Sequence, residues 1–127
     1  MNRKIIRTPE IEDLLSQKIK DVYQQRLGHQ LDKISYKLFD RTLIVMLEGI
    51  ITSPEKVLRN NDRTHLANQV RAVIDSVMRS QIQEIIEEVL DIKVVDFLSD
   101  TTVEKNLTGA IAIFEFKPKN ISGNDKS

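Results

Sequence analysis

The sequence predicts an α+β fold, a two-layer αββαββ sandwich in which two main helices cover one face of an antiparallel four-stranded sheet. Three observations predict it. Two segments carry apolar residues at helical spacing, four shorter segments carry the apolar patterns of strands, and turn residues separate them. The order helix, strand, strand occurs twice, although the residues of the two halves do not match.

The first predicted helix runs from Pro9 to Leu27. Thr8 can cap its free backbone N–H groups, Pro9 suits its first turn, and Gly28 can supply the left-handed residue that ends it. Its apolar residues recur every three or four positions and form one stripe: Ile11, Leu14, Leu15, Ile19, Val22, Tyr23 and Leu27. We therefore expect one buried face on this helix.

A predicted β-hairpin follows this helix. Apolar and polar residues alternate from Asp32 to Phe39, which is typical of a half-exposed strand. Asp40-Arg41 forms a tight turn, and Thr42 to Glu48 forms the second strand. Every position from Leu43 to Leu47 is apolar, so we expect both faces of this strand to be buried.

Two helices are predicted in the middle of the chain. Ser53-Pro54-Glu55 is a second start with a cap followed by proline and begins a short helix, and Asn60-Asn61-Asp62 interrupts it and offers a fresh cap. In the long helix that follows, apolar residues recur at helical spacing over roughly seven turns. Its apolar positions are Leu66, Val70, Val73, Ile74, Val77, Ile82, Ile85, Ile86 and Val89.

The last two strands are predicted at Ile92 to Leu98 and at Ala110 to Phe116, with a polar loop from Asp100 to Thr108 between them. Pro118 ends the ladder because it has no N–H to donate. The fourth strand is apolar on both faces: Ala110, Ala112, Phe114 and Phe116 share one face, and Ile111 and Ile113 share the other.

If both hairpins join one antiparallel sheet, the element order equals a ferredoxin-like fold whose first strand has moved to the end. A swapped or differently ordered sheet is the alternative. Two helices cannot cover both faces of the sheet. The second apolar face, formed by Ile44, Met46, Ile111 and Ile113, therefore needs another cover, and we predict a homodimer through the sheet face.

Length and composition limit the organisation and the partners. The chain has 127 residues, with 19 Lys+Arg and 19 Asp+Glu. It fits one domain at residues 9–117, between a flexible N-terminus at 1–8 and a disordered tail at 118–127. Zero net charge and few aromatic residues argue against a nucleic-acid partner. The lack of cysteine excludes disulfides, thiolate nucleophiles and zinc fingers.

Membrane insertion is not expected. Met1 to Arg7 lacks the apolar stretch of a signal peptide. The longest strongly apolar run, Leu43 to Leu47, is far shorter than the about 20 residues that a membrane-spanning helix needs. We therefore expect a cytoplasmic protein.

Residues that could serve in catalysis or metal binding form no recognisable motif. His29 and His65 lack the spacing of paired ligands, and the glycines do not cluster into a phosphate-binding loop. A hard cation could bind the carboxylate stripe on the long helix, but a solvated helix face is the preferred interpretation. That stripe consists of Glu84, Glu87, Glu88 and Asp91. We favour a non-enzymatic protein and predict no catalytic residue, no metal and no cofactor.

One loop is long for a hairpin. Ser99 to Asn106 exceeds the usual connection of about 2–5 residues, and long loops often serve binding, although a plain connection is the alternative.

Two stretches together resemble the MpsC-domain family, small soluble proteins of a sodium-translocating, membrane-potential-generating system. Val45 to Leu58 is similar to the family's strand that ends in Leu-Glu-Gly and is followed by Thr-x-x-Glu-x-x-Leu. Val94 to Asp100, with Ala112 to Phe116, is similar to its Phe-Leu-Ser-Asp strand end and closing strand. The resemblance covers Glu10 to Lys117.

The resemblance implies a role beside membrane proteins that transport sodium or inorganic carbon. Relatives often carry a compact His- or Asp-containing loop where this chain has Thr101 to Asn106. Because no segment can span a bilayer, the implied role is accessory or regulatory. The motif matches give these candidate binding residues: Glu48, Gly49, Thr52, Glu55, Phe97, Ser99 and Asp100.

Two functions stay open. One is a non-enzymatic homodimeric module that acts by protein–protein contact, with a membrane transport complex as its candidate partner. The alternative is a small-molecule or cation-binding domain that uses the regions of Glu48 and Asp100.

Overall fold

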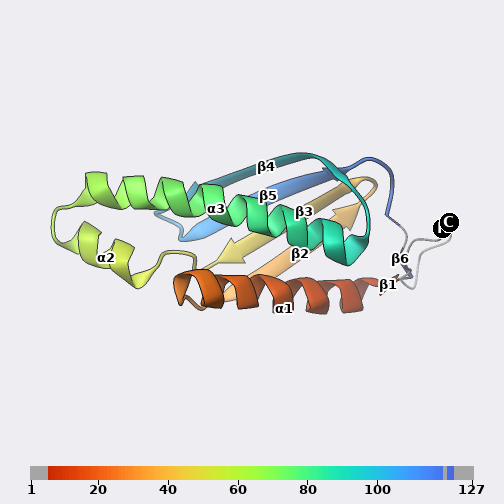
Figure 1. Ribbon diagram of the computed structural model, residues 1–127, viewed down its shortest axis with the longest axis horizontal. Helices are drawn as coiled ribbons and strands as arrows, with labels where there is room; N and C mark the ends of the chain where they lie inside the picture. The colour runs from red at the N-terminus through yellow and green to blue at the C-terminus, as the bar shows by residue number, and fades with distance from the viewer. Residues whose placement is uncertain (1–5, 119, 122–127) are drawn as a thin grey trace.

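The computed structural model describes residues 6–118 and 120–121 (Figure 1). Between two short end strands that the sequence did not predict, its described elements follow the predicted order. They are β1 (Ile6–Arg7), α1 (Thr8–Leu27), β2 (Lys33–Phe39), β3 (Thr42–Glu48), α2 (Ser53–Asn60), α3 (Thr64–Leu90), β4 (Val94–Thr102), β5 (Leu107–Phe114) and β6 (Asn120–Ile121).

The main sheet has the strand order β2-β3-β5-β4, and each neighbouring pair is antiparallel. This order equals a ferredoxin-like sheet whose first strand has moved to the end. The predicted α+β fold is therefore confirmed, and the two hairpins do join one sheet.

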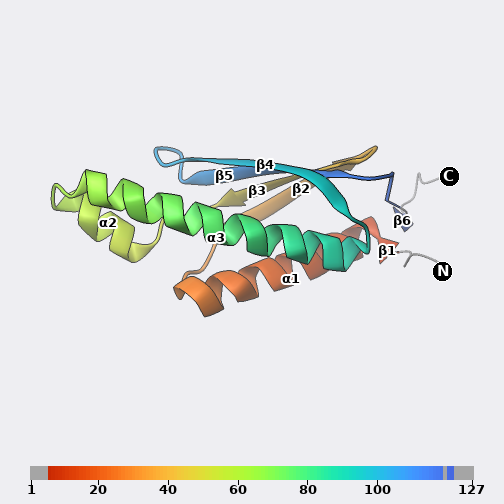
Figure 2. The same cartoon turned by 45° about the horizontal axis from the view of Figure 1, so that its top comes forward.

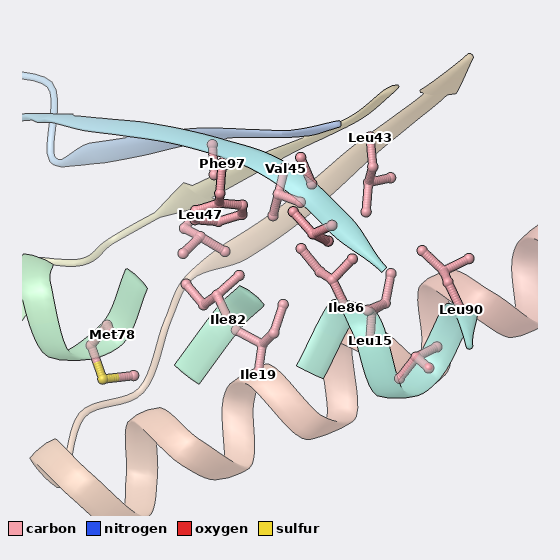
Figure 3. Close-up of a cluster of buried hydrophobic side chains, with 14 of the residues drawn as sticks. Leu15, Ile19, Leu43, Val45, Leu47, Met78, Ile82, Ile86, Leu90 and Phe97 are labelled. Atoms are coloured by element: carbon pink, nitrogen blue, oxygen red, sulfur yellow. The ribbon is translucent and has the colours of Figure 1, made fainter. Parts of the chain in front are cut away.

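Helices α1 and α3 lie on the same face of this sheet (Figure 2). Figure 3 shows side chains of both helices pointing toward the inward residues of β3 and β4. The core between the two layers is almost entirely aliphatic, as the scarcity of aromatic residues requires. Its largest fully buried apolar side chains are Phe114, Leu15, Ile19, Leu47, Ile50, Met78, Ile86 and Val45.

The opposite side of the sheet, called the outer face below, carries the alternate residues of each strand. The register arranges these residues in four rows that cross β2, β3, β5 and β4 in turn. The rows are Lys33, Glu48, Leu107 and Thr102; Ser35, Met46, Gly109 and Asp100; Lys37, Ile44, Ile111 and Leu98; and Phe39, Thr42, Ile113 and Asp96.

The middle of the outer face is apolar. Leu98 is 52 % exposed and Ile111 is 37 % exposed, while Ile44, Met46 and Ile113 are half-buried. Both long helices lie on the other side of the sheet (Figure 2), so neither covers these side chains.

A second exposed apolar surface lies on the projecting hairpin, which we define as α2 and the first half of α3, residues 53–77. This hairpin extends past the end of the sheet in Figures 1 and 2. Leu66, Val73 and Val77 share one side of α3 and are 45 %, 63 % and 41 % exposed. Val57 on α2 is 59 % exposed.

The prediction of a long polar loop between the last two strands is wrong. β4 continues to Thr102 and β5 begins at Leu107, so that only residues 103–106 form the turn. The strand was missed because its second half carries polar residues on both faces. Ser99 and Asp100 therefore lie in a strand and not in a loop.

The helix starts in the middle of the chain also differ from the prediction. Thr52, not Ser53, is the N-cap of α2. The N-cap of α3 is Arg63, which makes no side-chain capping bond, and Asp62 before it has a φ of 60°. The fresh cap expected within Asn60-Asn61-Asp62 is thus not used.

The chain ends meet in a short parallel pairing of Ile6–Arg7 with Asn120–Ile121. The predicted flexible N-terminus and disordered tail fall mostly on residues 1–5, 119 and 122–127, which lie outside the described residues. Across the described part of the chain, no helix combines the length and apolar character needed to cross a membrane.

Candidate functional site

The turn after β3 is built around Gly49. Its φ of 79° is left-handed, and a Cβ added there would lie 2.4 Å from the Asp32 carboxylate. Its N–H donates to Asn106 O at 2.9 Å, and the His29 ring nitrogen Nε2 donates to Gly49 O at 2.6 Å. Gly49 is therefore required by backbone conformation and close packing, without any ligand.

Glu55 closes the next turn by capping α2 from inside the helix. Its Oε2 accepts hydrogen bonds from Thr52 N at 2.9 Å and from Thr52 Oγ1 at 2.8 Å. Thr52 is 5 % exposed and Glu55 is fully buried. The Thr-x-x-Glu pattern thus has a structural role as a buried capping pair.

Arg71 supplies the cation that the buried Glu55 carboxylate needs. Its Nε lies 3.4 Å from Glu55 Oε1 and 3.4 Å from Asp75 Oδ1, and its Nη1 donates to Ile50 O at 3.2 Å. Glu55 Oε1 and Arg71 Nε form no well-directed hydrogen bond, so they interact by charge. Since only 5 % of Arg71 is exposed, these contacts are shielded from water.

Asp75 extends this network from α3 to the sheet. Its Oδ1 accepts a hydrogen bond from Thr101 Oγ1 at 3.1 Å, and the Thr101 and Thr108 hydroxyl oxygens lie 2.7 Å apart. Thr101 and Thr108 are paired across β4 and β5. We call Thr52, Glu55, Arg71, Asp75, Thr101 and Thr108 the buried polar network.

Burial raises the pKa of Asp75 above its usual value of 3.8. Arg71 and the Thr101 hydroxyl act in the opposite direction, while Glu55 and Asp100 raise the pKa further by charge repulsion. Burial also raises the pKa of Tyr23 to about 12, so this phenol stays neutral. Since Arg71 and Asp75 both affect Tyr23 electrostatically, the phenol lies within reach of the network.

A cavity of about 60 Å³ lies beside the network, between α1, α3 and the β4–β5 hairpin. Its volume has room for about two water molecules. Hydroxyl groups come from Tyr23, Ser99, Thr101 and Thr108, and a carboxylate comes from Asp75. The cavity can therefore hold a small polar species through several hydrogen bonds.

Arg79 closes one side of this cavity. Its guanidinium lies over the Phe97 ring, 5.8 Å from the centroid, and donates to Phe97 O. The aromatic contact and the backbone bond hold this cation next to the cavity.

The structure divides the seven predicted site residues among three places. Gly49, Thr52 and Glu55 belong to the turn and the buried polar network. Phe97 and Ser99 line the cavity, and Asp100 also borders it, although its register places its side chain on the outer face. Glu48 is exposed on the outer face. Its neighbours in the strand register are Lys33 on β2 and Leu107 on β5.

Glu48 and Asp100 are not brought together. They lie on β3 and β4 with β5 between them, so their strands are about 10 Å apart. One small ligand cannot contact both carboxylates directly. The described residues also include no group of three His, Asp or Glu side chains that could hold a metal ion.

Sequence reasoning missed the central position of Arg71. In the sequence, Arg71 and Asp75 have only the spacing of an ordinary ion pair four residues apart on a helix. A signal was present, because Arg71 shares its side of α3 with the apolar residues Ala67 and Met78. A cation within an apolar stripe indicates a buried partner of opposite charge.

Comparison with known families agrees with the two motif stretches. The family model described as the Na⁺-translocating membrane potential-generating system (MpsC) matches residues 7–116 of the chain. The chain belongs to the MpsC family. No curated protein and no solved structure matches it. The match covers both long helices and the four-stranded sheet, and the buried polar network lies inside it.

Removal of Arg71 tests the network of this MpsC domain. We expect Arg71→Met to lower the free energy of unfolding by about 3–5 kcal/mol, because it leaves Glu55 buried without a cation. Urea denaturation measures the change, with Arg63→Met at an exposed helix cap as the matched control.

The double variant Glu55→Gln/Arg71→Met should recover part of that loss, because it leaves no uncompensated buried charge. Equal stability of Arg71→Met and the wild type would contradict the assigned role of Arg71.

Proposed function

We propose that this MpsC domain is a cytoplasmic, non-enzymatic homodimeric module, accessory or regulatory, that acts by protein–protein contact with a membrane system transporting sodium or inorganic carbon. The family description supports the connection to a membrane energy system. The observation that carries the proposal is the apolar outer face, which neither long helix covers.

The outer face has the properties of an interaction surface. Single exposed apolar residues are common on proteins, but a contiguous patch indicates a partner. Ile44, Ile111 and Leu98 are neighbours in one row across three strands, and Met46 and Ile113 lie in the adjacent rows. A second copy would supply an apolar patch of the same kind, so that each copy covers the outer face of the other.

The projecting hairpin supports a separate contact with the membrane partner. It presents Val57, Leu66, Val73 and Val77 beyond the end of the sheet. If the sheet forms the dimer, these side chains stay exposed and available. Two different surfaces thus allow the module to dimerise and to bind its partner at the same time.

The dimer is tested first. We expect Ile111→Lys to abolish dimerisation, because it places a charge in the apolar centre of the outer face. Light scattering on a sizing column at micromolar concentrations measures the mass, with Gln24→Lys at an exposed position of α1 as the control. A monomeric wild type would contradict the proposal.

The membrane partner is tested by capture from gently solubilised membranes of the native cells. We expect a transport subunit to co-purify with the wild type and to be lost with Val73→Lys/Val77→Lys. Ser76→Lys, which adds a charge at an exposed position of the same helix, is the control and should retain the subunit. Equal recovery with all three proteins would show that the hairpin is not the contact.

A second candidate function is the binding of a small polar molecule. The cavity favours it, because Ser99 and Asp100 line it together with Thr101 and Asp75. Glu48 does not contribute, since it lies on the outer face.

Thermal unfolding with a screen of anions, nucleotides and divalent ions tests this candidate. A ligand at 100 times its Kd should stabilise the wild type by about 2.7 kcal/mol. Ser99→Ala/Thr101→Val should lose that stabilisation, whereas Ser35→Ala on the outer face should retain it. A compound that stabilises all three proteins equally does not bind in the cavity.

A further inference from the structure

The outer face carries basic residues on one edge strand and acidic residues on the other. Lys33 and Lys37 lie on β2, which forms one edge of the sheet. Asp96 and Asp100 lie on β4, which forms the other edge. The two strands between them carry Ile44, Met46, Ile111 and Ile113, next to Leu98 on β4, while Glu48 on β3 lies beside Lys33 in the first row.

The charged residues also differ in their position along the strands. Lys33 and Lys37 occupy the first and third rows, whereas Asp100 and Asp96 occupy the second and fourth. Rows on one face are two residues apart, which is about 6.7 Å along the strand. If β2 of one copy lies over β4 of a second copy with the rows aligned, basic and acidic residues therefore alternate along the strands.

Two copies can stack their outer faces about a twofold axis that lies between the sheets. An axis across the strands places β2 over the partner's β2 and β4 over the partner's β4, so like charges meet. An axis parallel to the strands places β2 over the partner's β4 at both edges. Charge complementarity selects the parallel axis, because like charges across an interface are unfavourable.

The same axis determines which residues of the two copies face each other in the centre of the face. It passes between β3 and β5 and keeps the rows aligned, so Ile44 lies over the partner's Ile111 and Met46 over the partner's Gly109. Gly109 has no side chain, and the Met46 sulfur of the same chain lies 3.4 Å from where a Cβ would be, so the two Met46 side chains of a dimer pack over the two glycines together. The third row thus stacks isoleucine on isoleucine, whereas the first row places Glu48 over the partner's Leu107.

We propose that the outer face docks a second copy of this chain about a twofold axis parallel to its strands, so that Lys33 and Lys37 lie against the partner's Asp96 and Asp100. This inference rests on the proposed homodimer and specifies how its two sheets are oriented. Their strands then run nearly parallel, as in aligned sheet packing.

The size of the face makes the edge charges important. Four strands about 4.8 Å apart and seven residues long span roughly 19 by 23 Å. This footprint of roughly 440 Å² per copy is smaller than the about 800 Å² per partner of a standard interface, so the apolar centre alone gives modest affinity. Charges at the rim then determine the orientation of the second copy.

Charge reversal at one edge tests the orientation. We expect Lys33→Glu/Lys37→Glu to raise the dimer Kd at least roughly tenfold, because two acidic edges then face each other. Asp96→Lys/Asp100→Lys should weaken the dimer similarly. The quadruple variant exchanges the two edges and should restore a Kd near that of the wild type.

Sedimentation velocity over a concentration series measures each Kd, and circular dichroism checks folding. Lys20→Glu/Lys56→Glu, on exposed helix positions, is the charge-matched control and should leave the Kd unchanged. Either double variant is sufficient for the test if the other fails to fold.

The outcomes separate this inference from the proposed function. If the wild type dimerises but both double variants keep its Kd, or the quadruple variant stays as weak as they are, the orientation is wrong and the dimer stands. If the wild type is a monomer throughout the series, both proposals fail.

Discussion

One constraint governs this molecule: two long helices can cover only one face of a four-stranded sheet. The central strands β3 and β5 carry apolar residues on both faces, a pattern typical of strands that are buried from both sides. Helices α1 and α3 bury the inner face and form the core there. The outer face keeps the same apolar character without a cover from these helices, which makes it the part of the fold that most needs a partner.

Inside the covered layer, the buried polar network connects parts of the chain that are far apart in sequence. Arg71 contacts the Ile50 carbonyl and Glu55 before and within α2, while Asp75 reaches Thr101 on β4. A buried ion pair is weak evidence for net stability, but the loss of one partner is costly. We infer that the network fixes the projecting hairpin relative to the sheet, which accounts for the Thr-x-x-Glu motif without a ligand.

Sequence patterns predicted those parts of the fold that depend on local periodicity. The helix of residues 8–27 and the first hairpin were predicted within one residue, because their apolar spacing is regular. The second hairpin was misread, because Ser99 and Thr101 face a polar cavity and α3 instead of the apolar core. Cross-strand register cannot be read from one sequence, so the distance between Glu48 and Asp100 and the charged edges of the outer face emerged only from the structure.

The central claim, that the outer face is buried between two copies, is tested most directly by methyl NMR over a dilution series. The account predicts concentration-dependent shifts for the methyl groups of Ile44, Met46, Leu98, Ile111 and Ile113, which lie on the outer face. Inner methyl groups such as those of Leu15 and Val45, which are fully buried, should not shift. Concentration-independent spectra, or shifts confined to Val73 and Val77 on the projecting hairpin, would contradict the account.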